Sequence, residues 1–346
     1  MNVLQSLLYK NDIKRVFSSF DFSFIKNQSF LITGGLGLIG STVVDLLLFA
    51  SKAMDCNTQI FIADLNEENF KKRYGEVRNV HFVEYNAIND IDFGIKFDYI
   101  IHGAGLANPG LYASNPIETM LTNFNGIKNL LVYSRDNAVK CILYISSSEV
   151  YGQKNGPDSF TETDYGIISV DDIRSSYAIA KKASEMLCKS FVSESGVNCL
   201  SVRPGHVFGP TASPNDKRIS SAFCFMGARG EKLILKSSGM QKRSYCYALD
   251  CASAILFLLN NGKRGESYNI GAKDVTTIKE MAEYVADFSD VELEIASPTF
   301  EEKAIFNKME NSSLNSDKLL ALGFRFCFDC KEGIEHTVSI LKEISE

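Results

Sequence analysis

An α/β fold with a doubly wound parallel sheet is predicted by three features of this 346-residue sequence. A short apolar run at residues 30–32 leads into a glycine-rich turn, and a helical pattern follows from residue 38. Further apolar runs alternate with helical patterns as far as about residue 205. Small and polar residues stand directly after several of these runs, which is where a parallel sheet presents its ligand site.

The glycine-rich turn contains Gly34, Gly37 and Gly40, and Leu38 and Ile39 begin the helix that follows. One glycine permits a tight turn, one allows a pyrophosphate to approach the backbone, and one lets the helix pack close to its strand. The N-terminus of the helix offers free N–H groups and a positive dipole end to an anion. Because ordinary turns contain similar glycine patterns, this signal needs support from the rest of the chain.

A second apolar run supplies that support, because residues 59–63 end at an acidic residue, Asp64. A carboxylate at this strand end is placed to accept hydrogen bonds from the adenosine ribose hydroxyls of a dinucleotide. It would also repel a 2′-phosphate. The sequence therefore predicts NAD rather than NADP as the cofactor, and the alternative interpretation is a polar strand end without a ligand.

The remaining elements follow in the order that a doubly wound sheet requires. The pattern changes after about residue 205, where residues 211–244 are loop-rich and polar and two further strand-and-helix units follow, near 250–259 and 277–287. The elements expected before that point are helices at 67–74 and 116–137 and strands at 81–85, 97–105 and 140–145.

Three regions are predicted from these patterns. Residues 1–29 form an N-terminal extension, residues 30–205 the cofactor-binding domain, and residues 206–346 mainly a substrate-binding cap with segments that return to the main sheet. The extension mixes apolar and basic side chains. It is interpreted either as an element packed on the outside of the core or as an oligomer contact, and the sequence leaves both open.

Charge and cysteine content narrow the class of partner. The net charge is −6, the pI is near 5.4 and no Lys/Arg-rich run is present, which disfavours nucleic acid and membrane surfaces as partners. Nine cysteines are scattered along the chain, and no second pair completes a four-ligand set with the close pair Cys327 and Cys330. We therefore expect no metal. With no signal peptide or membrane span in the pattern, we expect a reducing, cytoplasmic location.

Two clusters carry the predicted chemistry. Ser147 and Glu149 follow the strand at 140–145, and Tyr177 and Lys181 are four residues apart on a predicted helix, so they share one face. A neighbouring ammonium and an oxidised nicotinamide both favour a tyrosine phenolate. Tyr177 would take the proton from a substrate hydroxyl as hydride leaves for NAD, with Ser147 hydrogen-bonded to the same oxygen. Alone, this spacing also fits an ordinary amphipathic helix.

In combination, these features resemble the extended short-chain dehydrogenases/reductases, Rossmann-fold enzymes that modify nucleotide-activated sugars. The resemblance covers about residues 30–324 and implies a tightly held NAD that oxidises the sugar at C4. It also implies a homodimer formed through the helices near 115–135 and 175–195. The motifs that carry it are the glycine turn, Asp64, the strand end at 102–105, Asn123, the serine cluster before 150–152, Tyr177 with Lys181, Arg203-Pro204 and residues 239–250.

The resemblance also assigns binding residues. His206 stands where many members have an asparagine that contacts the substrate, and Asn86 where an aspartate often meets the adenine, so both depart from the usual pattern. The cofactor residues are Gly34, Gly37, Leu38, Ile39, Asp64, Asn86, Ala87, Ala104, Asn123, Tyr177 and Lys181. The substrate residues are Ser148, His206, Arg218 and Arg243, the last for the diphosphate.

Oxidation at C4 leaves three reactions open, namely loss of a C5 carboxylate, 4,6-dehydration and 4-epimerisation. Dehydratases commonly carry an Asp-Glu pair, but here the two positions are Ser148 and Glu149, which looks most like the UDP-glucuronate decarboxylases. We therefore expect a decarboxylase or 4,6-dehydratase of polysaccharide precursor synthesis, with 4-epimerisation as the alternative. The cation for an acidic sugar is left open among Lys236, Lys242 and Arg218.

The sequence disfavours two further classes of function. A non-catalytic NAD-binding regulator is disfavoured because Ser147, Tyr177 and Lys181 are all present. An NADPH-consuming reductase of a keto-sugar is disfavoured by Asp64.

Overall fold

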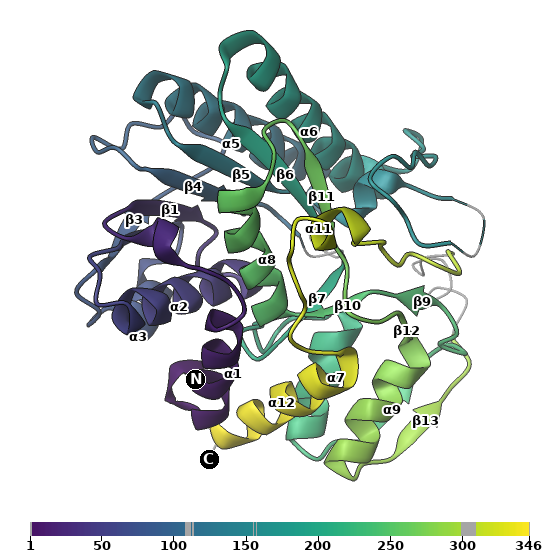
Figure 1. Ribbon diagram of the computed structural model, residues 1–346. Helices are drawn as coiled ribbons and strands as arrows, with labels where there is room; N and C mark the ends of the chain where they lie inside the picture. The colour runs from purple at the N-terminus through teal and green to yellow at the C-terminus, as the bar shows by residue number, and fades with distance from the viewer. Residues whose placement is uncertain are drawn as a thin grey trace.

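A seven-stranded parallel sheet forms the centre of the protein (Figure 1). The computed structural model describes residues 2–107, 112, 114–154, 156, 158–298 and 309–345. The strand order is β11-β6-β5-β4-β1-β2-β3. The strands are β1 (Ser29–Thr33), β2 (Gln59–Asp64), β3 (Val80–Glu84), β4 (Tyr99–His102), β5 (Cys141–Ile145), β6 (Cys199–Pro204) and β11 (Ser267–Ile270). The predicted α/β fold with a parallel sheet is confirmed.

Both faces of this sheet are buried, which explains why its strands are continuous apolar runs. On one face, Leu31 of β1 belongs to the same core as Ile127 of α5. On the other, Ile32 packs in a core with Val43 of α2 and Ile255 of α8. The helices around the sheet are α2 (Leu38–Ala53), α3 (Glu67–Tyr74), α5 (Pro116–Asn137), α6 (Ser176–Ser195) and α8 (Ala248–Asn261).

The chain beyond residue 205 contributes β11 and α8 to this central unit. The rest of it builds three two-stranded sheets and a group of helices below the main sheet in Figure 1. The domain boundary near residue 205 stays a prediction. The strands are β7 (His206–Phe208), β8 (Leu233–Leu235), β9 (Lys242–Arg243), β10 (Tyr245–Tyr247), β12 (Thr276–Thr277) and β13 (Leu293–Ile295). The helices are α7 (Ile219–Ala228), α9 (Ile278–Ser289), α11 (Asp317–Leu320) and α12 (Cys330–Glu343).

The N-terminal extension is packed onto the core. Its helix α1 (Leu7–Phe17) contacts α2, α8 and α12, and the two ends of the chain lie close together (Figure 1). Tyr9, Ile13 and Val16 are buried in the larger core cluster. Of the two interpretations of the extension, packing on the outside of the core is the one that these contacts support. Single-turn helices flank it at η1 (Val3–Gln5) and η2 (Ser23–Ile25).

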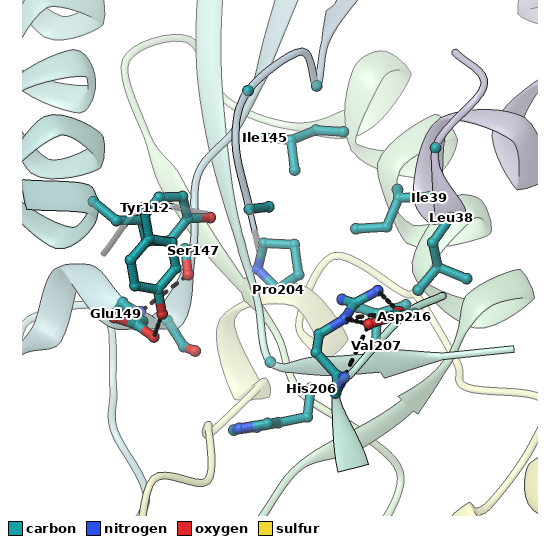
Figure 2. A pocket seen from close by; sticks show the side chains of 18 of the residues that line it. Leu38, Ile39, Tyr112, Ile145, Ser147, Glu149, Pro204, His206, Val207 and Asp216 are labelled. Atoms are coloured by element: carbon teal, nitrogen blue, oxygen red, sulfur yellow. Dashed lines mark hydrogen bonds and ion pairs between the residues drawn. The ribbon is translucent and has the colours of Figure 1, made fainter. Parts of the chain in front are cut away.

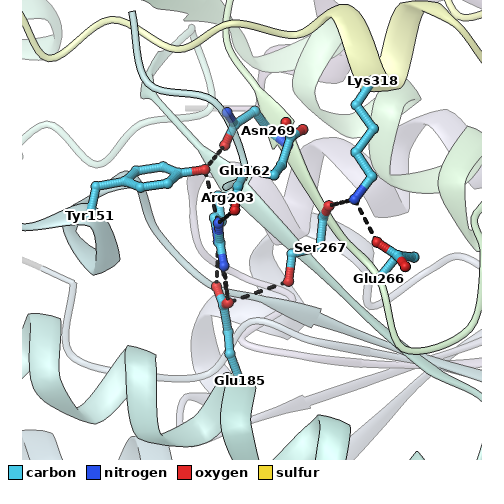
Figure 3. Close-up of polar contacts among 8 residues, drawn as sticks. All are labelled: Tyr151, Glu162, Glu185, Arg203, Glu266, Ser267, Asn269 and Lys318. Atoms are coloured by element: carbon cyan, nitrogen blue, oxygen red, sulfur yellow. Dashed lines mark hydrogen bonds and ion pairs between the residues drawn. The ribbon is translucent and has the colours of Figure 1, made fainter. Parts of the chain in front are cut away.

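A buried ion pair fixes helix α6 against the sheet (Figure 3). Arg203 of β6 and Glu185 of α6 lie 2.6 Å apart. Arg203 also donates to the Tyr151 hydroxyl at 2.9 Å, and that hydroxyl donates to Asn269 Oδ1 of β11 at 2.6 Å. Tyr151 ends the short helix η3 (Ser148–Tyr151), so one network ties α6, η3 and two strands together.

None of the helices among the described residues combines the length and apolarity that a membrane crossing requires. No three His, Cys, Asp or Glu side chains in the same ranges gather closely enough to hold a metal ion. All nine cysteines are free thiols.

Candidate active site

A cavity of about 920 Å³ opens where β1, β4, β5 and β6 end, at the point where the strand order reverses. In Figure 2, Tyr112, Ser147 and Glu149 form one wall, and Leu38 and Ile39 of the glycine turn form the opposite one. Ligands of doubly wound folds bind at this kind of position. The predicted site residues that line it are Gly34, Gly37, Leu38, Ile39, Ser147, Ser148, Glu149, Tyr177, Lys181, His206, Arg218 and Arg243.

The glycine turn forms a cradle that a side chain would fill. Gly34 has φ +67°, and a Cβ on it would lie 2.9 Å from the Ala104 backbone nitrogen. Gly37 is the N-cap of α2, where no side chain accepts the first N–H groups of the helix. The N-terminus of α2 therefore offers backbone donors and a positive dipole end to a phosphate.

The remaining predicted cofactor residues are not among the described residues that line the cavity, although Asp64 contacts the glycine turn. Asp64 ends β2, and its carboxylate accepts hydrogen bonds from the backbone nitrogens of Leu36 at 3.3 Å and Leu65 at 2.8 Å. Asn86 is exposed one strand further along, and Ala87 beside it is buried. This set has the acid, the exposed amide and the open backbone that a bound NAD requires, so the residues fit that cofactor.

Deeper in the fold, Asn123 of α5 is fully buried, and its Oδ1 has no hydrogen-bond partner among the described residues. A Cβ on Gly105 would lie 3.1 Å from this atom. Ala104 N donates to Thr33 Oγ1 at 3.2 Å, and the same hydroxyl contacts His102 Nδ1 at 2.6 Å. Burial, reinforced by the charge of Lys181, lowers the pKa of His102 to about 3, so this imidazole is neutral.

Tyr177 and Lys181 lie on the first turns of α6, as the spacing predicted, but their charges differ from expectation. Burial lowers the pKa of Lys181 to about 7, and its Nζ donates to the Ile145 carbonyl at 2.7 Å. Burial and the charge of Glu149 raise the pKa of Tyr177, while a hydrogen bond with Ser147 opposes this. Desolvation outweighs the predicted ammonium effect, because it disfavours both charged forms.

Glu149 has two neighbours that the sequence analysis missed. Its Oε1 accepts a hydrogen bond from the Tyr112 hydroxyl at 3.3 Å and lies 3.7 Å from Arg174 Nη2. The Tyr112 ring stacks on Tyr177 with centroids 4.9 Å apart. Arg174, in η4 (Ile173–Ser175), stands three residues before Tyr177, and this helical spacing could have drawn attention to it. Tyr112 carries no comparable signal, because it is far from both Glu149 and Tyr177 in the sequence.

The cavity is also rich in cations. Arg243 is 4% exposed, donates to the Lys242 carbonyl at 2.8 Å, and takes part in none of the ion pairs among the described residues. Arg218 is held by Asp216 at 2.5 Å. Of the three cations that the sequence left open, Arg218 lines the cavity, whereas neither Lys236 nor Lys242 belongs to the described lining.

Three buried polar atoms on the wall lack a hydrogen-bond partner among the described residues. They are Ser146 Oγ, His206 Nδ1 and Ser312 Oγ. Burial, followed by the charges of Arg243 and Arg218, lowers the pKa of His206 to about 3, so its imidazole is neutral. Buried polar atoms are normally paired, so these three indicate a polar ligand.

Comparison with known proteins decides the family. Residues 30–271 match the NAD dependent epimerase/dehydratase family. The chain belongs to this family. Its N-terminal extension lies outside the matched region, and the family description supplies the cofactor that the glycine cradle fits.

Named relatives include both lyases and isomerases. UDP-glucuronic acid decarboxylase 6 of Arabidopsis thaliana is 30% identical over 282 residues, which cover 80% of this chain and 79% of that protein. Human dTDP-D-glucose 4,6-dehydratase is 26% identical over 333 residues, covering 90% and 89%. The solved UDP-glucose 4-epimerase of Thermotoga maritima, in complex with UDP-glucose, has a TM-score of 0.76 at 25% identity and covers 92% of this chain and 100% of its own.

The glycine cradle yields a direct prediction. Gly34→Ala should purify with at least tenfold less bound NAD than the wild type, because its Cβ meets the Ala104 backbone in addition to the left-handed φ. The measurement is the NAD released from denatured protein, quantified by chromatography. Gly94→Ala is the matched control, since Gly94 has φ +62° and open space around its Cβ. Equal NAD in Gly34→Ala and wild type would contradict the assignment.

Proposed function

We propose that this chain is an NAD-dependent enzyme that removes the C6 carboxylate of a nucleotide-diphosphate-linked uronic acid after oxidation at C4. The observation that carries the proposal is the grouping of Glu149, Arg174 and Tyr112 beside Tyr177 in one cavity. The named relatives, among them the Arabidopsis decarboxylase, support the same reaction class.

The side chains have distinct roles in this proposal. Tyr177 accepts the proton of the C4 hydroxyl, and Ser147 donates a hydrogen bond to the same oxygen. The glycine cradle, Asp64 and Lys181 would hold NAD, which would supply the hydride acceptor for C4 and later the hydride donor. The proton stays on the Tyr177 oxygen until C4 is reduced again, when it returns to the C4 oxygen.

The ketone at C4 makes the neighbouring carboxylate labile. The C5–C6 bond breaks, CO₂ leaves, and the bonding electrons pass into an enolate at C4, which Tyr177 or Ser147 stabilises by hydrogen bonding. A proton taken up from solvent at C5 then restores the ketone, and the Tyr177 proton remains for the C4 oxygen when C4 is reduced. Arg174 is the cation on this wall that can orient an acidic sugar, and Glu149 fixes Arg174 at 3.7 Å.

Binding of the diphosphate is assigned to the other end of the cavity. Arg243 is buried and its planar guanidinium suits a bidentate contact with phosphate oxygens. Arg218 adds a second positive charge, and the neutral His206 offers a hydrogen-bonding ring nitrogen. The charge of Arg243 offsets part of the negative charge of the pyrophosphate, and Arg218 adds less because Asp216 is paired with it.

Two alternatives share the same oxidised intermediate. A 4,6-dehydratase would need an acid for the C6 hydroxyl, and Ser148 stands at that position. A 4-epimerase would need neither Glu149 nor Arg174 for chemistry, and the Thermotoga maritima structure shows that the fold accommodates that reaction in a relative. The pairing of Glu149 with a cation favours decarboxylation over both.

A homodimer is proposed from an apolar face on α5. Ile117, Met120, Leu121 and Phe124 follow an i, i+3, i+4, i+7 pattern and are 40–75% exposed. Met186 of the adjacent α6 is 64% exposed. A second copy of this chain, packed helix against helix, would bury this stripe. The nine free thiols support the proposed cytoplasmic location, where thiols remain reduced.

The first experiment incubates the purified protein, without added cofactor, with a panel of UDP-, dTDP-, GDP- and CDP-linked sugars and follows product mass. We expect loss of 44 mass units from a uronic acid substrate, as CO₂ leaves. Loss of 18 would mean dehydration, and unchanged mass with a new NMR spectrum would mean epimerisation.

Tyr177→Phe tests the proposed base. The variant should lose about 10²–10⁴-fold in rate while it retains NAD. An active variant would show that Tyr177 is not the base.

Glu149→Gln separates decarboxylation from epimerisation. The amide keeps the shape but loses the charge that holds Arg174, so formation of the decarboxylated product should fall by about 10²-fold or more. Oxidation at C4 should continue, which single-turnover reduction of the bound cofactor, seen at 340 nm, would report. An unchanged rate of product formation would favour epimerisation instead.

Leu121→Asp tests the dimer. A carboxylate in the centre of an apolar interface costs a few kcal/mol, so this variant should sediment as a monomer where the wild type is a dimer. Ile295→Asp is the control, because Ile295 is similarly exposed but lies on β13 of the cap. A dimeric Leu121→Asp protein would place the interface elsewhere.

A further inference from the structure

A buried carboxylate in the N-terminal extension is paired entirely with residues of the distant C-terminal region. Asp12 of α1 is 3% exposed. Its Oδ2 accepts a hydrogen bond from the Tyr247 hydroxyl at 2.9 Å, and its Oδ1 lies 2.9 Å from His336 Nδ1 of α12. A carboxylate is costly to bury unless its partners hold it in place, so this contact fixes α1 relative to Tyr247.

Tyr247 is the last residue of β10, which pairs in parallel with β7. In this register Tyr245 stands opposite His206, and Tyr247 stands opposite Phe208. His206 N donates to the Ser244 carbonyl at 2.9 Å, directly before β10. Asp12 therefore contacts β10, and β10 is the strand that pairs with His206 of β7.

The same strand continues back into the proposed diphosphate site. Arg243 lies four residues before Tyr247, at the end of β9, and lines the cavity together with His206. His206 Nδ1 is buried and has no partner among the described residues. A shift of β10 along its axis would move both of these groups relative to a bound ligand.

Helix α12 packs against the β10–β7 pair through Gly333. A Cβ on Gly333 would lie 3.0 Å from the Phe208 ring and 3.1 Å from the Tyr247 Cβ, so the helix packs tightly on the strand pair. His336 follows Gly333 by three residues and reaches Asp12. Phe328 packs edge-on against the Tyr247 ring with centroids 5.0 Å apart. Tyr247 thus has its ring fixed by α12 and its hydroxyl fixed by α1.

One turn before Asp12, α1 is also attached to the cofactor side of the molecule. Tyr9 is fully buried and its hydroxyl donates to Asp45 Oδ2 of α2 at 2.9 Å. Asp45 has further partners in Arg73 and Tyr74. Helix α1 therefore connects α2, which begins at the glycine cradle, with β10, which leads to the substrate side.

We propose that Asp12 is a positioning residue: through the Tyr247 hydroxyl it sets the β10–β7 pair so that His206 and Arg243 meet the diphosphate of the substrate. The proposal rests on the function proposed above. It gives the extension, which lies outside the residues that match the family, a role in substrate affinity. Because Asp12 does not line the cavity, it acts only through Tyr247 and the strand pair.

Tyr247→Phe tests this by removing one hydroxyl and nothing else. It should weaken binding of UDP, measured by calorimetry on the NAD-loaded protein, by about 3- to 30-fold. With the uronic acid substrate, KM should rise by a similar factor while kcat stays unchanged, because Tyr177 and Lys181 are untouched. Hydrogen–deuterium exchange should increase in peptides covering 204–209 and 242–247.

Tyr9→Phe is the matched control. It removes a second buried tyrosine-to-aspartate hydrogen bond of 2.9 Å from the same helix, but this bond leads to α2. It should lower the melting temperature while UDP affinity and exchange in the two peptides stay at wild-type values. All assays run well below the melting temperature of each variant.

A double-mutant cycle then identifies Asp12 as the residue through which Tyr247 acts. Asp12→Ala should weaken UDP binding, and adding Tyr247→Phe to it should cause little further loss, because the two residues share one contact. Additive losses would overturn the proposal, as would equal effects of Tyr247→Phe and Tyr9→Phe or wild-type UDP affinity in Tyr247→Phe. If UDP, dTDP, GDP and CDP all fail to bind the wild type, the proposed function itself fails and this proposal fails with it.

Discussion

The buried ion pair between Arg203 and Glu185 is the contact on which the geometry of the site depends. It joins β6 to α6 at 2.6 Å, and Glu185 lies one turn beyond Lys181 on the same helix. Through Tyr151 it also holds η3, which carries Glu149. Breaking such a pair would leave an uncompensated charge in the interior, so α6 and η3 are held together strongly. Tyr177 of α6 and Glu149 of η3 are thereby presented to one cavity from separate elements.

Desolvation explains the pKa shifts of the two central residues of the cavity, Tyr177 and Lys181. Burial raises the pKa of Tyr177 and lowers that of Lys181 to about 7, so both shifts reduce the charge of the pair. A bound oxidised nicotinamide would supply a positive charge that acts in the opposite direction and favours the phenolate. The residues thus form a site whose proton affinity depends on what is bound there, which suits a base that must accept a proton and later return it.

Much of the fold and the central chemistry followed from local sequence patterns. The glycine turn, Asp64 and the pair Tyr177 and Lys181 were identifiable because a strand end or a helix face fixes their spacing within a few residues. Tyr112 was missed because nothing in its immediate neighbourhood marks it, and Arg174 because its one local signal, the spacing to Tyr177, is common on helices. Both belong to the site because they contact Glu149, and the folding of the chain brings each of them to it. Of the cations considered for an acidic sugar, the structure placed only Arg218 in the described lining.

The sequence by itself determined the parallel α/β sheet and the cofactor class. It also determined the order along the chain of the glycine turn, Asp64, the serine cluster and the Tyr177 and Lys181 pair. These features depend on periodicity and short motifs. The tertiary structure decided how groups that are distant in sequence meet: Arg174 with Glu149, Tyr112 with Tyr177, and Asp12 with Tyr247. It also decided the directions in which the pKa values of Lys181 and His206 move, since a pKa in the interior depends on burial and on neighbouring charges. The physical reason is common to all of these: desolvation and side-chain contact are properties of the packed chain, and no local pattern encodes them.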